Sequence, residues 1–145
     1  RALLAVHPGI GYDIIANHPA ANGVTLGRGA YLDYQAFAHG VSQLDGGVLL
    51  SVGSAIMAPQ VFEKAMSFAN NLRRQQGLRP IRPFILVNDL TTIDWDWGKD
   101  EPPIDNPAYY LRFCKSFSRM GGDMVYAGGD NVVLLANLQA ALAEE

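Results

Sequence analysis

Glycines and polar residues follow each of four apolar segments in this sequence, at positions where they could bind a small molecule. They are Gly9, Gly11 and Asp13 after the first segment, Gly53 and Ser54 after the second, Asn88 and Asp89 after the third, and Asp130 after the fourth. If these segments are parallel strands, their carboxyl ends meet at one edge of a sheet, where α/β proteins bind ligands. Glycine lets the backbone approach a ligand, and amide and carboxylate groups fix its polar atoms. The spacing therefore predicts a small-molecule site at that edge.

Plainer interpretations of these residues stay open. Gly9-Ile10-Gly11 begins a dinucleotide-binding pattern, but Ile14 occupies the third glycine position and no acid ends the following strand. Gly53-Ser54 either binds an anion at a helix start or only turns the chain. No metal site is predicted, because no established zinc spacing fits the candidate ligands His7, Asp13 and His18.

A long acidic connection follows the third apolar segment. The stretch Leu90–Asn106 contains five acidic residues, two prolines and two tryptophans, and Trp97 precedes Gly98 and Lys99 within it. Connections of this length are uncommon in compact domains unless they have a function. We expect it to be a lid, a subunit contact or both.

Apolar runs and helical spacing alternate along the chain and predict an α/β fold. The expected strands are Ala2–Val6, Val48–Val52 (buried on both faces), Pro83–Val87 and Asp123–Ala127. The expected helical segments are a short turn at Ile14 and Ile15, then Ala30–Leu44, a helix from Pro59 to Gly77, Pro107–Phe117 and Asn131–Leu142, with a glycine-rich loop over Ala20–Gly29. Crossovers of this length imply a mostly parallel, three-layer, Rossmann-like sheet with helices on both faces.

Composition limits the class of protein. The chain has 145 residues, 49% hydrophobic and 17% charged, and a formal net charge of −3. These values predict a single soluble α/β domain over residues 1–145, with neither nucleic acid nor membrane as partner. The lone cysteine, Cys114, fits a reducing cytoplasm.

The opening of the sequence suggests further partners. Arg1 leads directly into the apolar segment Ala2–Val6. We expect residues 1–145 to be the carboxyl-terminal part of a longer protein, or to take neighbouring strands from another chain. Association with an amino-terminal half or with further copies is therefore expected.

Nearly the whole chain resembles the carboxyl-terminal portion of deoxyhypusine synthase. The segments that carry the resemblance, in the family's order, are Ile10–Asp13, Val48–Gly53, Gln60–Leu72, Pro83–Asp89, Trp97-Gly98-Lys99, Met124–Ala127 and Asn131–Leu142. The resemblance implies a transferase-like fold that binds NAD and an amine. It also implies that Asp13 helps to hold the amine.

The resemblance further assigns a chemical role to the tryptophan loop. In that family a lysine forms an imine with the aminobutyl group of spermidine after NAD has oxidised the amine. Lys99 matches this lysine, and Trp97 supplies aromatic cover that excludes water. A lysine in an acidic loop is also often only solvated, and that alternative stays open.

Two departures from the family pattern argue against deoxyhypusine synthesis itself. Ala58-Pro59-Gln60 replaces the family's Lys-His-His, and Leu90–Ile93 replaces its Asp-Gly-Ser-Asp-Ser-Gly stretch. The amino-terminal half, with much of the NAD contact, has no counterpart here. We therefore expect a related domain that binds a nucleotide, such as NAD, or an amine-bearing metabolite. The alternative is a non-catalytic, oligomeric assembly module with the same fold.

Overall fold

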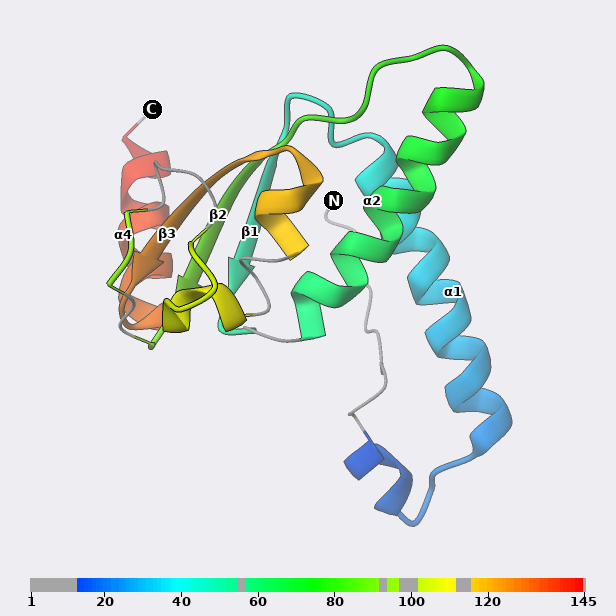
Figure 1. Cartoon of the computed structure of the whole chain (residues 1–145). Coiled ribbons are helices and arrows are strands. Elements are labelled where there is room, and N and C mark those ends of the chain that lie inside the picture. Colours follow the sequence, from blue (N-terminus) through cyan, green and yellow to red (C-terminus); the bar gives the residue numbers. More distant parts are fainter. Residues whose placement is uncertain (1–12, 55–56, 92–93, 97–101, 112–115, 145) are drawn as a thin grey trace.

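The computed structural model describes residues 13–54, 57–91, 94–96, 102–111 and 116–144. The elements, in chain order, are η1 (Asp13–Asn17), α1 (Gly23–Ser42), β1 (Val48–Val52), α2 (Met57–Gln75), β2 (Phe84–Asp89), η2 (Pro107–Tyr110), η3 (Ser118–Met120), β3 (Asp123–Gly128) and α4 (Asn131–Ala143) (Figure 1). The predicted strand Ala2–Val6 lies outside the described residues.

Three parallel strands form the sheet, in the order β1-β2-β3. Val48 pairs with Phe84 and Phe84 with Asp123, and the register continues to Val52, Asn88 and Ala127. The prediction of an α/β fold with a parallel sheet is confirmed for these strands. All three therefore end at the same edge of the sheet.

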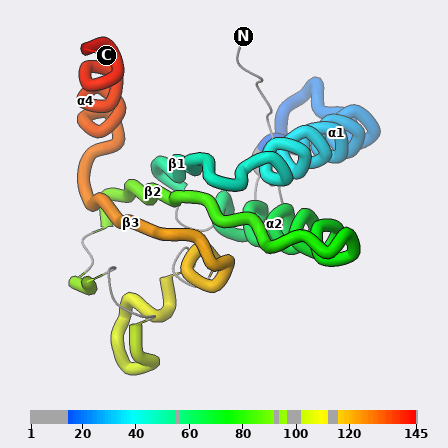
Figure 2. The backbone as a smooth tube through the Cα atoms, turned by 90° about the horizontal axis from the view of Figure 1, so that it is seen from above, coloured from blue at the N-terminus to red at the C-terminus, as the bar shows by residue number. Residues whose placement is uncertain are grey.

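One face of the sheet carries the hydrophobic core. Alternate residues of each strand point to this face, and Ile85 and Val87 of β2 are fully buried there. Helices α1 and α2 lie side by side over it (Figures 1 and 2). Phe62 of α2 meets Phe117 edge-on, with ring centroids 5.3 Å apart. The buried core thus joins α1, α2, β2 and Phe117.

The opposite face is largely uncovered. Its apolar side chains Val48, Leu50, Phe84 and Val125 are exposed. Helix α4 lies on this side (Figure 2), but none of its residues is buried. The prediction that Val48–Val52 is buried on both faces is wrong, because the described helices that pack tightly cover only one. The full three-layer arrangement stays a prediction.

Helix α1 begins earlier than the sequence indicates. The prediction of a loop over Ala20–Gly29 is wrong from Gly23 onward. The side chain of Asn22 accepts a hydrogen bond from the Thr25 N–H at 3.0 Å and caps the helix. This cap, with continuation into the buried part of α1, outweighs the low helix propensity of glycine.

The predicted helix Pro107–Phe117 is interrupted at Leu111. Asn106 caps a single 3₁₀ turn at η2, and Leu111 is extended, with φ −67° and ψ 126°. Ser116 and Phe117 are helical, and Gly121 (φ 78°) ends the turn η3 that follows them; residues 112–115 lie outside the described residues. The buried Phe117 side chain fixes the chain against α2.

The other helical predictions are confirmed. A short turn forms at η1, α2 ends at Gln75 with Gly77 (φ 71°) in the turn that follows, and Asp130 caps α4. The helical spacing of Met57, Val61, Ala65, Phe68 and Leu72 predicts an apolar stripe on α2, and the observed stripe is shifted from it. Phe62, Ala65 and Met66 are buried, whereas Phe68 and Leu72 are exposed.

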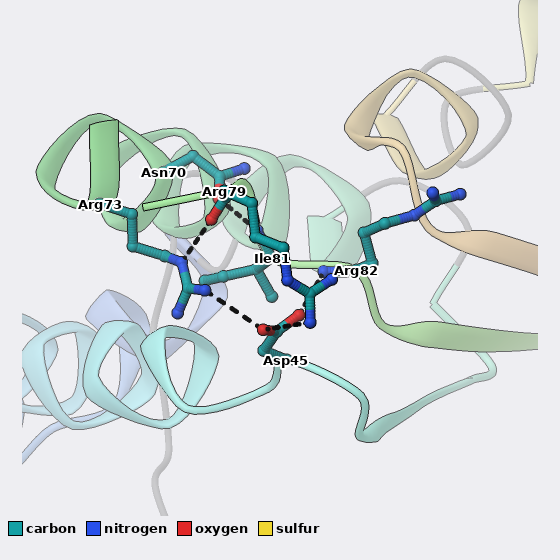
Figure 3. A network of polar contacts seen from close by, with 6 residues as sticks. All are labelled: Asp45, Asn70, Arg73, Arg79, Ile81 and Arg82. Carbon is teal, nitrogen blue, oxygen red and sulfur yellow. Dashed lines mark hydrogen bonds and ion pairs between the residues drawn. The ribbon is translucent and has the colours of Figure 1, made fainter. Parts of the chain in front are cut away.

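Asp45 ties the amino end of the sheet together (Figure 3). Its carboxylate accepts the Arg82 backbone N–H at 3.1 Å and contacts the guanidinium groups of Arg73 and Arg79, each at 3.2 Å. The Arg82 hydrogen bond and the two guanidinium charges outweigh partial burial and lower the pKa of Asp45. The same network includes the Ile81 N–H, donated to the Asn70 side chain at 2.9 Å. The loops that precede β1 and β2 are thereby joined to α2.

We predict that Asp45→Asn lowers the melting temperature at pH 7. Because the folded-state pKa is below the unfolded value of about 3.9, the carboxylate stabilises the fold above that pH. Its contribution disappears as the pH falls through the folded-state pKa. Thermal unfolding should therefore show that the melting temperatures of the unaltered chain and of Asp45→Asn differ at pH 7, and that this difference disappears toward pH 3. Asp105→Asn, at an exposed carboxylate, is the control. The same difference in melting temperature at pH 3 would show that Asp45 acts through packing instead.

Candidate functional site

The carboxyl edge of the sheet brings together polar residues from distant parts of the sequence. The Gly53 N–H donates to the Asn88 carbonyl at 3.0 Å, and the Gly129 N–H donates to the Asp89 carbonyl at 2.9 Å. These bonds extend the two strand pairings past their last residues. The predicted residues Gly53, Asn88 and Asp89 are therefore neighbours, with Asp130 one residue beyond Gly129.

Asn88 is the buried centre of this edge. Its side chain is only 3% exposed and donates to the carbonyls of Ala127 at 2.7 Å and Gly129 at 3.3 Å. The amide thereby holds the exit of β3 against β2. Its Oδ1 atom is buried and has no hydrogen-bond partner in the part of the chain that the structure describes. Buried amide oxygens are normally paired, so this one marks a position for a donor.

Asn131 is a second amide at the same edge, which the sequence analysis missed. A Cβ atom on Gly53 would lie 2.8 Å from its Nδ2 atom, so β1's exit and the start of α4 touch. Its Oδ1 atom is likewise buried without a partner among the described residues. The sequence feature that could have identified Asn131 is its position as a polar residue at the start of an otherwise largely apolar helix.

Two carboxylates also lie at this edge, that of Asp130 next to Asn131 and that of Asp89 on the opposite face of the sheet from Asn88. Asp89 accepts from the backbone N–H and the hydroxyl of Thr91, at 3.2 and 3.3 Å, through Oδ1. Asp130 accepts the N–H groups of Val132 and Val133, at 2.8 and 3.1 Å, also through Oδ1. Both bonding patterns are local, so each carboxylate keeps an oxygen that these bonds do not use. The edge is rich in acceptors.

Tyr126 connects the edge to the segment that follows β2. Its hydroxyl donates to the Thr91 carbonyl. Burial and the charge of Asp89 raise the pKa of Tyr126 above its ordinary value. The phenol is therefore a neutral hydrogen-bond donor at physiological pH.

Ser54 has a structural role at the start of α2. Its Oγ atom accepts the Ala58 N–H at 3.1 Å. This bond satisfies one of the free N–H groups with which an anion would otherwise interact. The capping role weakens the prediction of an anion site at Gly53-Ser54.

Several predicted site residues lie outside the described residues. These are Gly9, Gly11, Trp97 and Lys99, and of Asp13 only the backbone, at the start of η1, is described. The described part of the chain contains no group of three or more His, Cys, Asp or Glu residues placed to hold a metal. Within the same ranges, no helix is long and apolar enough to cross a bilayer.

Comparisons of the chain with known protein families, with curated proteins and with solved structures gave no match. Function is therefore inferred from the geometry of the carboxyl edge.

We predict that Gly53→Ala is more destabilising than Gly77→Ala. Both glycines have positive φ, near 70°, so alanine at either costs about 1–2 kcal/mol of unfolding free energy through backbone strain. Only position 53 adds a clash, with the Asn131 side chain, and should cost about 1 kcal/mol more. Urea unfolding of the two variants measures the difference.

Asn131→Ala provides the matched background for that comparison. In the Asn131→Ala protein, the additional loss of unfolding free energy caused by Gly53→Ala should largely disappear, because the clashing amide is gone. Equal costs for both glycines in the original background would contradict the contact between β1's exit and α4.

Proposed function

We propose that the carboxyl edge of the sheet binds an amine-bearing small molecule. The observation that carries the proposal is the set of acceptors gathered there. Two buried amide oxygens, of Asn88 and Asn131, have no partner among the described residues. The carboxylate of Asp130 precedes Asn131 at the start of α4, and that of Asp89 lies at the same edge on the other face of the sheet. A ligand amine supplies both the N–H donors and the positive charge that this set lacks.

The same acceptors disfavour a phosphate-bearing nucleotide such as NAD. Two carboxylates at the edge repel a phosphate. The N-termini of α4 and α2, which would attract one, already donate to Asp130 and Ser54. Of the two ligand classes that the sequence suggests, the amine is therefore the better supported.

The resemblance to deoxyhypusine synthase agrees with an amine ligand. In this proposal the sheet belongs to a three-layer, Rossmann-like domain, and Lys99 and Trp97 of the tryptophan loop complete the site. The three-layer arrangement and the roles of Lys99 and Trp97 are supported by the sequence pattern alone. A transferase activity is therefore a further step beyond amine binding.

We predict that spermidine raises the melting temperature, whereas NAD does not. Asp89→Asn and Asp130→Asn should each weaken spermidine binding about three- to tenfold, because each removes one charge at the edge. Both changes keep the local hydrogen bonds, since asparagine also caps helices and forms the same turn. Isothermal titration calorimetry measures the affinities.

Asp123→Asn is the control, because Asp123 begins β3 at the opposite edge of the sheet. It should leave spermidine binding unchanged. Stabilisation by NAD but not by spermidine would favour the nucleotide instead. Absence of binding by either ligand would contradict a site at this edge.

The uncovered apolar surface favours a second candidate function, an oligomeric assembly module. Helix α4 carries no charged residue, and its Val132 and Leu142 are 74% and 64% exposed. The neighbouring sheet face exposes Val48 and Leu50. A parallel sheet is normally covered on both faces, so this surface is expected to be buried against something.

A second copy of the chain is the occupant that we infer. Each copy has a formal net charge of −3, which opposes contact between charged surfaces. The uncharged α4 avoids that repulsion. Two copies can therefore meet through α4 and the adjoining sheet face.

We predict that Val132→Asp shifts the chain from dimer toward monomer in light scattering coupled to size exclusion. A carboxylate in an apolar contact is costly to bury, so the dimer should weaken at least tenfold. Val24→Asp is the control, at an equally exposed valine of α1. A monomeric unaltered chain at 100 μM would contradict this candidate.

A further inference from the structure

A cavity lies between the edge strand β1 and the two helices α1 and α2. Its volume is about 320 Å³. The lining is mostly apolar and includes Phe37 of α1, Leu49 of β1, Val61 of α2 and Phe117. Among the described residues that line it, none is charged. The volume is at the lower end of the range for small-molecule sites.

Ser51 is the polar group of this cavity. It alternates along β1 with Leu49 and so shares the face of the sheet that α1 and α2 cover. The residue is only 6% exposed, and its Oγ atom has no hydrogen-bond partner in the described part of the chain. A buried hydroxyl without a partner is unfavourable. A molecule in the cavity can supply the missing partner.

One wall of the cavity is already fixed. Phe62 and Phe117 pack edge-on with ring centroids 5.3 Å apart, and both side chains are fully buried. At the mouth, Ser54 is bonded to the Ala58 N–H. The cavity therefore requires little rearrangement to accept a ligand, which reduces the cost of binding.

The lining determines the chemistry of the ligand. Aromatic and aliphatic side chains favour an apolar body. A charged group would be buried without a counter-ion, which is costly. The hydroxyl of Ser51 donates to a carbonyl oxygen or accepts from a hydroxyl. These constraints select a small, uncharged molecule with one hydrogen-bonding group.

We propose that this cavity is a binding site for a small, uncharged, mostly apolar molecule whose carbonyl or hydroxyl group pairs with Ser51. The site is distinct from the carboxyl edge, since Asn88, Asp89, Asp130 and Asn131 are not among the described residues that line the cavity. The Asn88 side chain also belongs to the other set of alternating residues and points to the α4 side. It therefore does not depend on the proposed amine binding.

Acetophenone and ethylbenzene are suitable probes, because they have similar shapes and differ in the carbonyl group. Saturation-transfer NMR titration of the full chain should show that acetophenone binds more tightly. Ser51→Ala should weaken acetophenone binding about three- to tenfold, the range for one hydrogen bond, and leave ethylbenzene binding unchanged. Ser67→Ala, on the exposed part of α2, is the matched control and should change neither affinity.

A second variant tests the cavity itself. Val61→Phe places a ring among the lining residues and should abolish binding of both probes. Asp89→Asn, at the carboxyl edge, should leave both affinities unchanged, so that failure of either proposal can be recognised separately. No binding of either probe to the unaltered chain would overturn the site. Equal affinities that Ser51→Ala does not change would overturn the role of the hydroxyl.

Discussion

Parallel pairing on both sides of β2 is the constraint on which the rest of the structure depends. Because β1 and β3 both run in the direction of β2, every strand exit lies at one edge and every strand entry at the other. The crossover through α2 then places that helix over the core face. The acceptor-rich edge and the cavity beside β1 both follow from this arrangement.

The two edges of the sheet differ in how completely their polar groups are paired. At the entry edge, the carboxylate of Asp45 is matched by a backbone N–H and two guanidinium groups. At the exit edge, buried amide oxygens of Asn88 and Asn131 lack partners among the described residues. A paired network stabilises the loops that it joins, whereas unpaired buried acceptors cost stability unless a ligand satisfies them. The proposed binding site thus lies at the edge opposite the stabilising network.

Sequence patterns predicted the strands well and the helices less well. β1 and β2 are short apolar runs with glycine or proline before them, so local signals suffice. The start of α1 depends on one capping side chain, and the chain is extended at Leu111; apolar spacing shows neither feature. The meeting of Gly53, Asn88, Asp89 and Asp130 followed from parallel topology alone. Asn131 did not, because its role depends on a contact across the fold with Gly53.

The poor burial of α4 has a consequence for the order in which this fold comes apart. A helix of 13 residues is marginal in water by itself, and this one ends beside the acidic Glu144, which the helix dipole disfavours. Its amides should therefore exchange with solvent sooner than those of α2 or β2. Each such opening releases Asn131 from Gly53 and uncovers the exit edge. In the proposed function, access of a ligand to this edge is therefore linked to the fraying of the helix beside it.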